Sequence, residues 1–265
     1  MWHNLARLAG YRGLIQSLVA RELKARYRGS VLGFFWSFVN PLLLLSIYSF
    51  VFAKILPPNA TAANLPYEVF LFCGLLPWTW FSASLVEGTG ALIAGGNLIK
   101  KVLFPAEILP IVTVLANLVH FALGLLILAG FMMWRQHPPD WHELAWFPVI
   151  VAVQLVFTLA LTLLLSALTV HFRDIKDLLA NLLTFWFFAT PIIYSYKDPN
   201  VVGYIGYFNW NPMFHLAISY QEVLFFRGPF GHYRWLLALG AASLVLFLMA
   251  YWVFEPSRPT PESAP

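Results

Sequence analysis

Long stretches without a charged residue constrain this chain more than any other feature of its sequence. Only 11% of its 265 residues are charged, against about a quarter in soluble globular proteins. A helix needs about 20 apolar residues to cross the roughly 30 Å hydrocarbon layer of a bilayer. Most of the uncharged stretches are long enough to do so: 29–53, 69–86, 88–99, 108–134, 144–172, 178–196, 199–221 and 235–254. This pattern excludes an ordinary soluble enzyme and predicts an all-α integral membrane protein.

The basic residues indicate how these spans are oriented. We predict six transmembrane helices, at roughly 31–55, 67–94, 106–134, 145–171, 177–196 and 234–254. Both termini then lie on one side, and short cytoplasmic loops are enriched in Lys and Arg. Placing the termini in the cytoplasm gives that side eleven of the sixteen basic residues. The net charge of +4 follows from this loop bias and from contact with anionic lipid heads, and it requires no nucleic-acid partner.

The N-terminal segment 1–29 is too charged to span a membrane and is amphipathic instead. Apolar side chains between residues 5 and 23 fall within one arc at 100° per residue, and most basic residues lie opposite. This pattern predicts a cytoplasmic helix lying in the membrane surface. Arg12, Glu22 and Arg26 interrupt the apolar arc. Both a purely lipid-anchoring helix and a helix that docks a protein partner fit this pattern.

The remaining sequence predicts one membrane domain and a short tail. Residues 30–255 hold the six helices, and the Pro- and Ser-rich segment 256–265 has the composition of a disordered cytoplasmic tail. Between the fifth and sixth helices, about 198–232 is uncharged at its centre but interrupted by Gly, Asn and Pro. Such a backbone is tolerated within a membrane only against protein or water. We predict an external re-entrant hairpin broken at 209–212, with a seventh span as the alternative.

Residue types that support catalysis or nucleotide binding are sparse. The sequence lacks G-x-x-x-x-G-K-[ST], so the chain cannot hold ATP in a phosphate loop, and energy must come from elsewhere. The seven histidines are scattered, and the lone Cys73 has no partner at metal-site spacing. Glu87 lies near the middle of the second predicted span, where a charge costs at least about 2.5–3.5 kcal/mol. It is expected to face protein or a cavity, or to be protonated, and both a hydrogen bond to a neighbouring helix and a functional role stay open. We predict no metal site and no catalytic residue.

Aromatic side chains gather in the first and fifth predicted spans. Four of the five residues in 34–38 are aromatic, and so are all four in 185–188. Adjacent side chains cannot all face one way, so some must meet lipid or pack against other helices. The interpretation for the rest is a passage in which sugar C–H faces slide over aromatic rings. Many weak contacts suit a polymer, because a conduit must both admit and release its cargo.

Four blocks of sequence resemble a known transporter family. They are RYRGSVLGFFWSFVNPLL (26–43), LIKKVLFPAEILP (98–110), HFRDIKDL (171–178) and NPMFHLAISYQEVLFFRG (211–228). In this order, over residues 10–255, they resemble the ABC-2 type permeases that export polysaccharide: the O-antigen, capsule and teichoic-acid transporters. The resemblance implies a homodimer of six-helix subunits in the bacterial inner membrane. It also implies two nucleotide-binding ATPase subunits that hold ATP and Mg²⁺, no cofactor on this chain, and a polyprenyl-linked glycan as the substrate.

The resemblance also assigns roles to individual residues. It puts contacts with the ATPase on the surface helix, on a cytoplasmic elbow after the second span and in the second cytoplasmic loop: Arg12, Arg21, Lys24 and Arg26; Asn97, Lys100, Lys101 and Phe104; Arg173 and Asp174. It puts the external gate at Asn209, Asn211 and Pro212. The residues expected to line the channel are Phe34, Trp36, Tyr48, Phe185, Trp186 and Phe188. The lipid phosphate of the substrate is expected to meet Arg26 and Arg28, because clustered cations suit phosphate.

The function implied by this resemblance is export of a lipid-linked, O-antigen-like polysaccharide driven by ATP hydrolysis on the partner subunits. Closure of the ATPases would push the elbows and surface helices, and the first and fifth spans of the two copies would part. Two alternatives stay open. An ABC-2 exporter of a small drug or lipid would need an enclosed pocket, and a membrane-embedded enzyme acting on lipid-linked sugars would need an acid or histidine cluster at a water interface.

Overall fold

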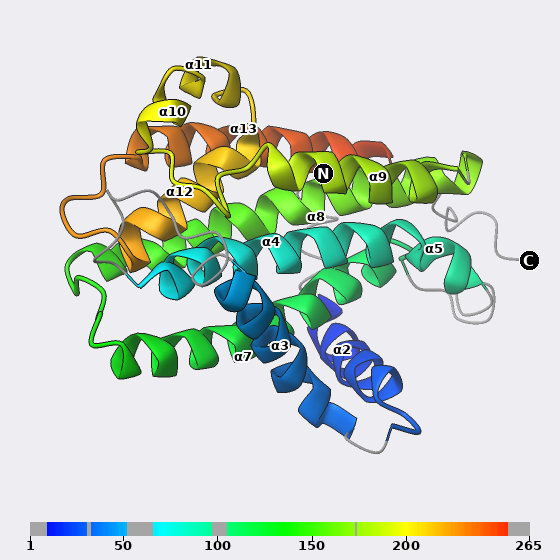
Figure 1. Cartoon of the computed structure of the whole chain (residues 1–265). Helices are drawn as coiled ribbons and strands as arrows, with labels where there is room; N and C mark the ends of the chain where they lie inside the picture. Colours follow the sequence, from blue (N-terminus) through cyan, green and yellow to red (C-terminus); the bar gives the residue numbers. More distant parts are fainter. Residues whose placement is uncertain (1–9, 31–32, 52–65, 97–104, 173, 254–265) are drawn as a thin grey trace, which may run out of the picture.

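The computed structural model describes residues 10–30, 33–51, 66–96, 105–172 and 174–253. Within these ranges the chain is all-helical (Figure 1). Four helices are long and apolar enough to cross a membrane: α4 (Tyr67–Thr89), α7 (Ile108–Trp134), α8 (Phe147–His171, after the 3-10 turn η4 at Glu143–Trp146) and α13 (Tyr233–Val253). The predictions of an all-helical chain and of several membrane spans are confirmed.

Shorter helices occupy the other two predicted spans. The 3-10 turn η1 (Gly33–Phe35) leads into α3 (Trp36–Phe50), and residues 52–65 lie outside the described ranges. In the fifth span, α9 (Ile175–Phe188) stops short of the predicted boundary. That boundary was wrong because Pro191 has no N–H to continue the helix, and the residue before a proline disfavours helical backbone.

Short helices fill the two ends of the bundle. Near one end lie α2 and α5, and the opposite end holds α10 and α11 (Figure 1). The bounds of the short helices are α2, Arg12–Arg26; α5, Ala91–Ala94; α10, Pro199–Val202; α11, Ile205–Phe208; and α12, Pro212–Leu224. The predicted break at 209–212 separates α11 from α12. The segment is divided into the three separate helices α10, α11 and α12, so a straight seventh span does not form there.

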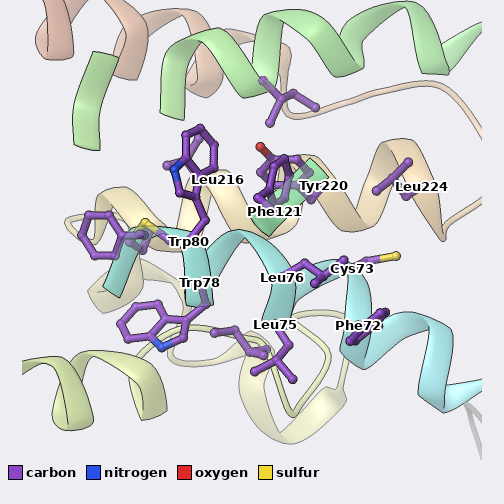
Figure 2. Close-up of a cluster of buried hydrophobic side chains, with 14 of the residues drawn as sticks. Phe72, Cys73, Leu75, Leu76, Trp78, Trp80, Phe121, Leu216, Tyr220 and Leu224 are labelled. Carbon is purple, nitrogen blue, oxygen red and sulfur yellow. The ribbon is translucent and has the colours of Figure 1, made fainter. Parts of the chain in front are cut away.

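Helix α4 lies at the centre of the bundle, and most of its side chains are buried. It packs against α7, α8 and α12 through close contacts of its side chains. Figure 2 shows this core, with aromatic and aliphatic side chains of α4 beside residues of α7 and α12. Trp80 stacks on Phe121 of α7 with ring centroids 5.0 Å apart, and Phe121 meets Tyr220 of α12 edge-on. The core thus joins three helices that are distant in sequence.

Helix α2 packs on this bundle through the apolar arc predicted from the sequence. Leu18 is buried against Ile108 and Val112 at the start of α7, and Ile15 and Val19 pack beside it. The basic side chains on the opposite face of α2 are exposed. In the described residues, this arc therefore contacts protein of the same chain.

Glycines bring α4 close to two of its neighbours. A Cβ atom at Gly88 would lie 2.2 Å from Cγ2 of Thr162 on α8, and one at Gly124 of α7 would lie 2.5 Å from Leu76 of α4. Small residues allow helices to approach closely, and such packing drives helix association in membranes. The position of α4 therefore depends on the absence of a side chain at these two residues.

We expect Gly88→Ala to destabilise the protein by about 1–3 kcal/mol, because the added methyl group overpacks the contact with Thr162. Adding Thr162→Ser removes Cγ2 but keeps the hydroxyl group, so the double variant should regain most of the lost stability. Thermal unfolding in detergent measures both effects. The control is Gly130→Ala on α7, where a Cβ meets nothing within 4 Å. Equal destabilisation by the two alanines would contradict the packing role of Gly88.

Candidate functional site

The aromatic residues of α9 occupy two different environments. Phe185 and Phe188 are 77% and 59% exposed. Neighbouring helical residues point in directions about 100° apart, so Trp186 faces a different side from Phe185, towards α4. Its ring packs edge-on against Phe81 of α4, with centroids 5.2 Å apart, and also contacts Trp78. Of the predicted lining residues on this helix, two are therefore exposed and Trp186 is half-buried against the protein core.

Helices α3 and α9 each expose an apolar face. The exposed residues recur at helical spacing and are Leu43, Ile47 and Phe50 on α3 and Leu178, Leu182 and Phe185 on α9. Among the other predicted lining residues, Trp36 is half-buried, and the side chains of Phe34 and Tyr48 lie outside the described structure. Helix faces with several exposed apolar side chains in a row suit contact with lipid or with another protein surface.

Asn211 ties the end of α9 to the start of α12. Its Oδ1 accepts the backbone N–H two residues further on, which caps α12, and the indole N–H of Trp186 at 2.6 Å. Its Nδ2 donates to the carbonyl of Ala189 and to the hydroxyl of Thr190. Pro212 follows at the first helical position, where a missing N–H is tolerated. The break predicted from the sequence is therefore a hydrogen-bonded corner, which we call the Asn211 corner.

A histidine pair lies beside the Asn211 corner. Nε2 of His215 donates to the carbonyl of Asn209 at 2.9 Å. Nδ1 of the neutral ring is then an acceptor, and it receives the Nε2–H of His232, 2.8 Å away. His215 also stacks on Trp235, with ring centroids 4.7 Å apart. Glu222 holds the loop that contains His232 by accepting hydrogen bonds from two of its backbone N–H groups, one of them that of His232. The pair thus joins α12 to the loop that precedes α13.

The C-terminus of α2 meets α4 and α7 in an ionic cluster. Arg26 donates to Oε2 of Glu87 at 2.6 Å and to Oδ1 of Asn117 at 2.9 Å. Asn117 in turn donates to Glu87 at 2.7 Å. Of the alternatives for Glu87, a hydrogen bond to a neighbouring helix is the one observed. Its expected place near the middle of the span was wrong, since α4 ends two residues later at Thr89.

Of the residues that we expect to contact an ATPase and that the structure describes, Arg26 is half-buried in the ionic cluster and the others are exposed. These are Arg12, Arg21 and Lys24 on α2 and Asp174 before α9. A hollow of about 830 Å³ lies among the surrounding helices, and its lining includes Arg21, Glu22, Arg26, Gly95 and Lys176. Outside the described residues lie Asn97, Lys100, Lys101, Phe104 and Arg173. Arg28 is exposed, and its expected contact with lipid phosphate stays a prediction.

Comparison with known proteins identifies the family. Residues 13–225, which extend from α2 to just beyond α12, match the protein family described as "ABC-2 type transporter". The chain belongs to the ABC-2 type transporter family. The ionic cluster at Arg26 and the Asn211 corner of this transporter chain both lie within the matched range.

Three relatives cover most of this ABC-2 transporter chain. The O-antigen export system permease protein RfbA of Myxococcus xanthus is 44% identical over 251 residues, which are 94% of each chain. A protein of the same name from Klebsiella pneumoniae is 30% identical over 243 residues, 91% of each chain. The polysialic acid transport protein KpsM of Escherichia coli is 24% identical over 224 residues, 79% of this chain and 80% of the relative. Their names describe export or transport of polysaccharide.

Sequence reasoning missed the histidine pair and Glu222. His215 and His232 are 17 positions apart, and no helical period relates them. Glu222 accepts from the Tyr196 hydroxyl, which is 26 positions away, and from backbone N–H groups of a loop that folds back on α12; neither kind of partner leaves a local signal in the sequence. The break at Asn211 was predicted because Gly, Asn and Pro interrupt the uncharged stretch there. Within the described residues, no group of three or more His, Cys, Asp or Glu is placed to hold a metal.

The environment of the histidine pair favours neutral rings. Burial, followed by the charge of His215, lowers the pKa of His232 to about 4, and burial lowers the pKa of His215. A histidine whose folded pKa lies below its ordinary value of about 6.5 stabilises the protein above that value. This stabilisation is lost as pH falls from about 6.5 towards 4. Protonation of Nδ1 of His215 would also remove the acceptor of the hydrogen bond, and protonation of both rings would bring two cations together.

We expect acidification from about pH 7 to about pH 4.5 to lower the thermal stability of this protein more than that of His232→Gln. Glutamine keeps an N–H donor near the position of Nε2 but cannot take up a proton. Thermal unfolding in detergent at both pH values is the measurement. His142→Gln is the matched control, since His142 is exposed and should leave the pH dependence unchanged. If His232→Gln lost as much stability as the unaltered protein, the histidine pair would not be the acid-sensitive element.

Proposed function

We propose that this chain is the transmembrane subunit of an ABC transporter that exports a lipid-linked, O-antigen-like polysaccharide across the bacterial inner membrane. The observation that carries the proposal is the 44% identity, over 94% of both chains, to an O-antigen export permease. The similarity to a polysialic acid transport protein supports a polysaccharide as the substrate class. ATP and Mg²⁺ bind to separate ATPase subunits, since this sequence has no phosphate loop, and the chain itself is not an enzyme.

Two copies of the chain and two ATPase subunits form the transporter. In each copy, α3 and α9 complete six membrane crossings, and both termini lie in the cytoplasm. The exposed apolar faces of α3 and α9 support this arrangement, because a second copy opposite them encloses a passage between the protomers. The segment 198–232 is the external re-entrant hairpin. The packing of α12 against α4, α8 and α13 supports the hairpin, because broken helices inside the membrane must be surrounded by protein or line a cavity filled with water.

Transport follows from movement of the peripheral helices. ATP-driven closure of the partner subunits pushes α2 and the elbow at 97–104, and α3 and α9 of the two copies part. Phe185 and Phe188 then offer ring faces to the sugar chain. The bond from Trp186 to Asn211 connects α9 to the hairpin, so a shift of α9 also shifts the gate. Polyprenyl-linked glycan enters from the cytoplasmic side, where basic residues such as Arg28 attract its phosphate.

We expect cells without this chain to keep lipid-linked glycan inside, and its re-expression with the ATPase to restore ATP-dependent appearance of glycan outside. Surface labelling of the glycan, with the internal lipid-linked pool measured in parallel, makes the test. An ATPase variant that binds but does not hydrolyse ATP is the control. Transport of a small drug or lipid without glycan export would favour another ABC-2 substrate, and glycan modification by the purified chain alone would favour an enzyme.

The arrangement of the two copies can be tested by cysteine cross-linking. Cys73 is the chain's one cysteine and is buried, so Cys73→Ala gives a suitable background. We expect Phe185→Cys to form a disulfide-linked dimer in membranes on mild oxidation, because α9 faces the second copy. Val245→Cys on α13 is a matched control, since Val245 is 59% exposed on another helix. Cross-linking through Val245 but not through Phe185 would contradict the proposed protomer interface.

A further inference from the structure

A second set of hydrogen bonds beside Arg26 links the end of α2 to α3. The hydroxyl group of Tyr27 lies 2.6 Å from Oγ of Ser37 on α3 and 2.6 Å from Nε2 of His120 on α7. Together with the ionic cluster, these groups form a six-residue assembly that we call the α2 joint: Arg26, Tyr27, Ser37, Glu87, Asn117 and His120. Four helices, α2, α3, α4 and α7, are therefore connected by polar contacts within the α2 joint.

The hydrogen bonds through Tyr27 have a fixed direction. Nδ1 of His120 lies 3.0 Å from the carbonyl oxygen of Ala116, and a carbonyl only accepts, so Nδ1 carries a proton. In the neutral ring, Nε2 then accepts from the Tyr27 hydroxyl, and Ser37 must donate to Tyr27. Because no donor in this sequence of bonds can exchange roles with an acceptor, the Tyr27 hydroxyl connects α3 to α7 in one arrangement only.

The ionic half of the α2 joint fixes the end of α2 to the bundle. The Arg26 side chain is 20% exposed, and its guanidinium reaches Glu87 on α4 and Asn117 on α7 at the same time. A planar guanidinium with fixed donor directions suits such two-pronged contact, and a lysine ammonium cannot reproduce it. Because α4 and α7 belong to the packed core, a force on α2 turns it about Arg26 more easily than it displaces the core.

A cavity beside the α2 joint leaves room for α3 to move. Its volume is about 280 Å³, and it lies between α3, α4 and α7. Besides residues of the joint, its walls include the apolar side chains of Trp36, Pro41, Leu44, Leu76 and Phe121. A close-packed interior resists sliding of one element past another. Side chains of α3 are therefore not close-packed against α4 and α7 at this place, so α3 meets less steric resistance to a shift there than in a packed interior.

We propose that the α2 joint is the pivot that converts displacement of α2 into displacement of α3, with Arg26 and Tyr27 as its positioning residues. Arg26 holds the end of α2 against the core, and the neighbouring Tyr27 passes the motion to Ser37 at the start of α3. This inference rests on the proposed function, in which α2 receives the push of the ATPase and α3 lines the passage. It gives Arg26 a mechanical role distinct from contact with lipid phosphate.

The test uses the complete transporter, assembled with its ATPase subunits in membrane vesicles that contain lipid-linked glycan. ATP hydrolysis and glycan export are measured on the same vesicles. Arg26→Lys and Arg26→Gln should keep assembly and hydrolysis but lower the glycan exported per ATP by about tenfold, the loss typical of one charge-assisted hydrogen bond. Exchanging the charges, with Arg26→Glu and Glu87→Arg together, should restore part of the export, because the Asn117 amide can turn to suit either partner, although the carboxylate at position 26 then lies beside Glu22.

Arg234→Gln is the matched control, since Arg234 is an exposed arginine at the start of α13 and takes no part in the α2 joint. It should leave the glycan exported per ATP unchanged. A phosphate-binding role for Arg26 would spare Arg26→Lys, which keeps the charge, and would give Arg28→Gln the same loss as Arg26→Gln. That pattern overturns the proposal, and so does unchanged export per ATP in both Arg26 variants.

Tyr27→Phe keeps the proposal testable if the Arg26 variants do not assemble. It removes only the hydroxyl group and retains the ring. We expect it to lower export per ATP while hydrolysis stays normal, and normal coupling in this variant refutes the pivot. Failure of the proposed function would give a different result, because the unaltered transporter would then show no ATP-dependent glycan export.

Discussion

The lack of hydrogen-bonding partners in the hydrocarbon layer is the constraint on which the whole structure depends. It forces the backbone into helices, and because lipid tails are as apolar as the side chains, the helices must associate through close packing. Helix α4 achieves this with close glycine contacts to α7 and α8 and with buried rings towards α7 and α12. The resulting core is the fixed body against which α2, α3 and α9 are held.

Polar interactions are concentrated where the peripheral helices join this core. The Asn211 corner attaches α9 at one end of the bundle, and the α2 joint attaches α2 and α3 at another place. Burying polar groups without partners is costly, so each site satisfies its groups through several bonds at once. Such bonds are either made or broken, whereas a packed core deforms little. They are therefore suitable places for a transporter to switch between arrangements of α3 and α9.

The sequence predicted the helices more accurately than their ends and contacts. Uncharged length was sufficient for α4, α7, α8 and α13, because the thickness of the bilayer sets a length that the sequence must match. The same criterion overestimated α9, since its uncharged stretch continues past Pro191 although the helix does not. The break at Asn211 could be predicted from the Gly, Asn and Pro that interrupt the uncharged stretch there. The contacts of Arg26 could not, because Glu87 and Asn117 belong to helices that the sequence does not relate to α2.

The sequence by itself determined the membrane class, the long helices, the Asn–Pro corner and, through the order of its motifs, the transporter family. Apolar length, loop charge and helix-start signals are local properties, so one sequence displays them directly. Only the tertiary structure decided which distant side chains meet: Arg26 with Glu87, Trp186 with Asn211, and His215 with His232. These contacts depend on which helix faces fit at close range, and that fit is a property of the packed bundle and not of any single segment.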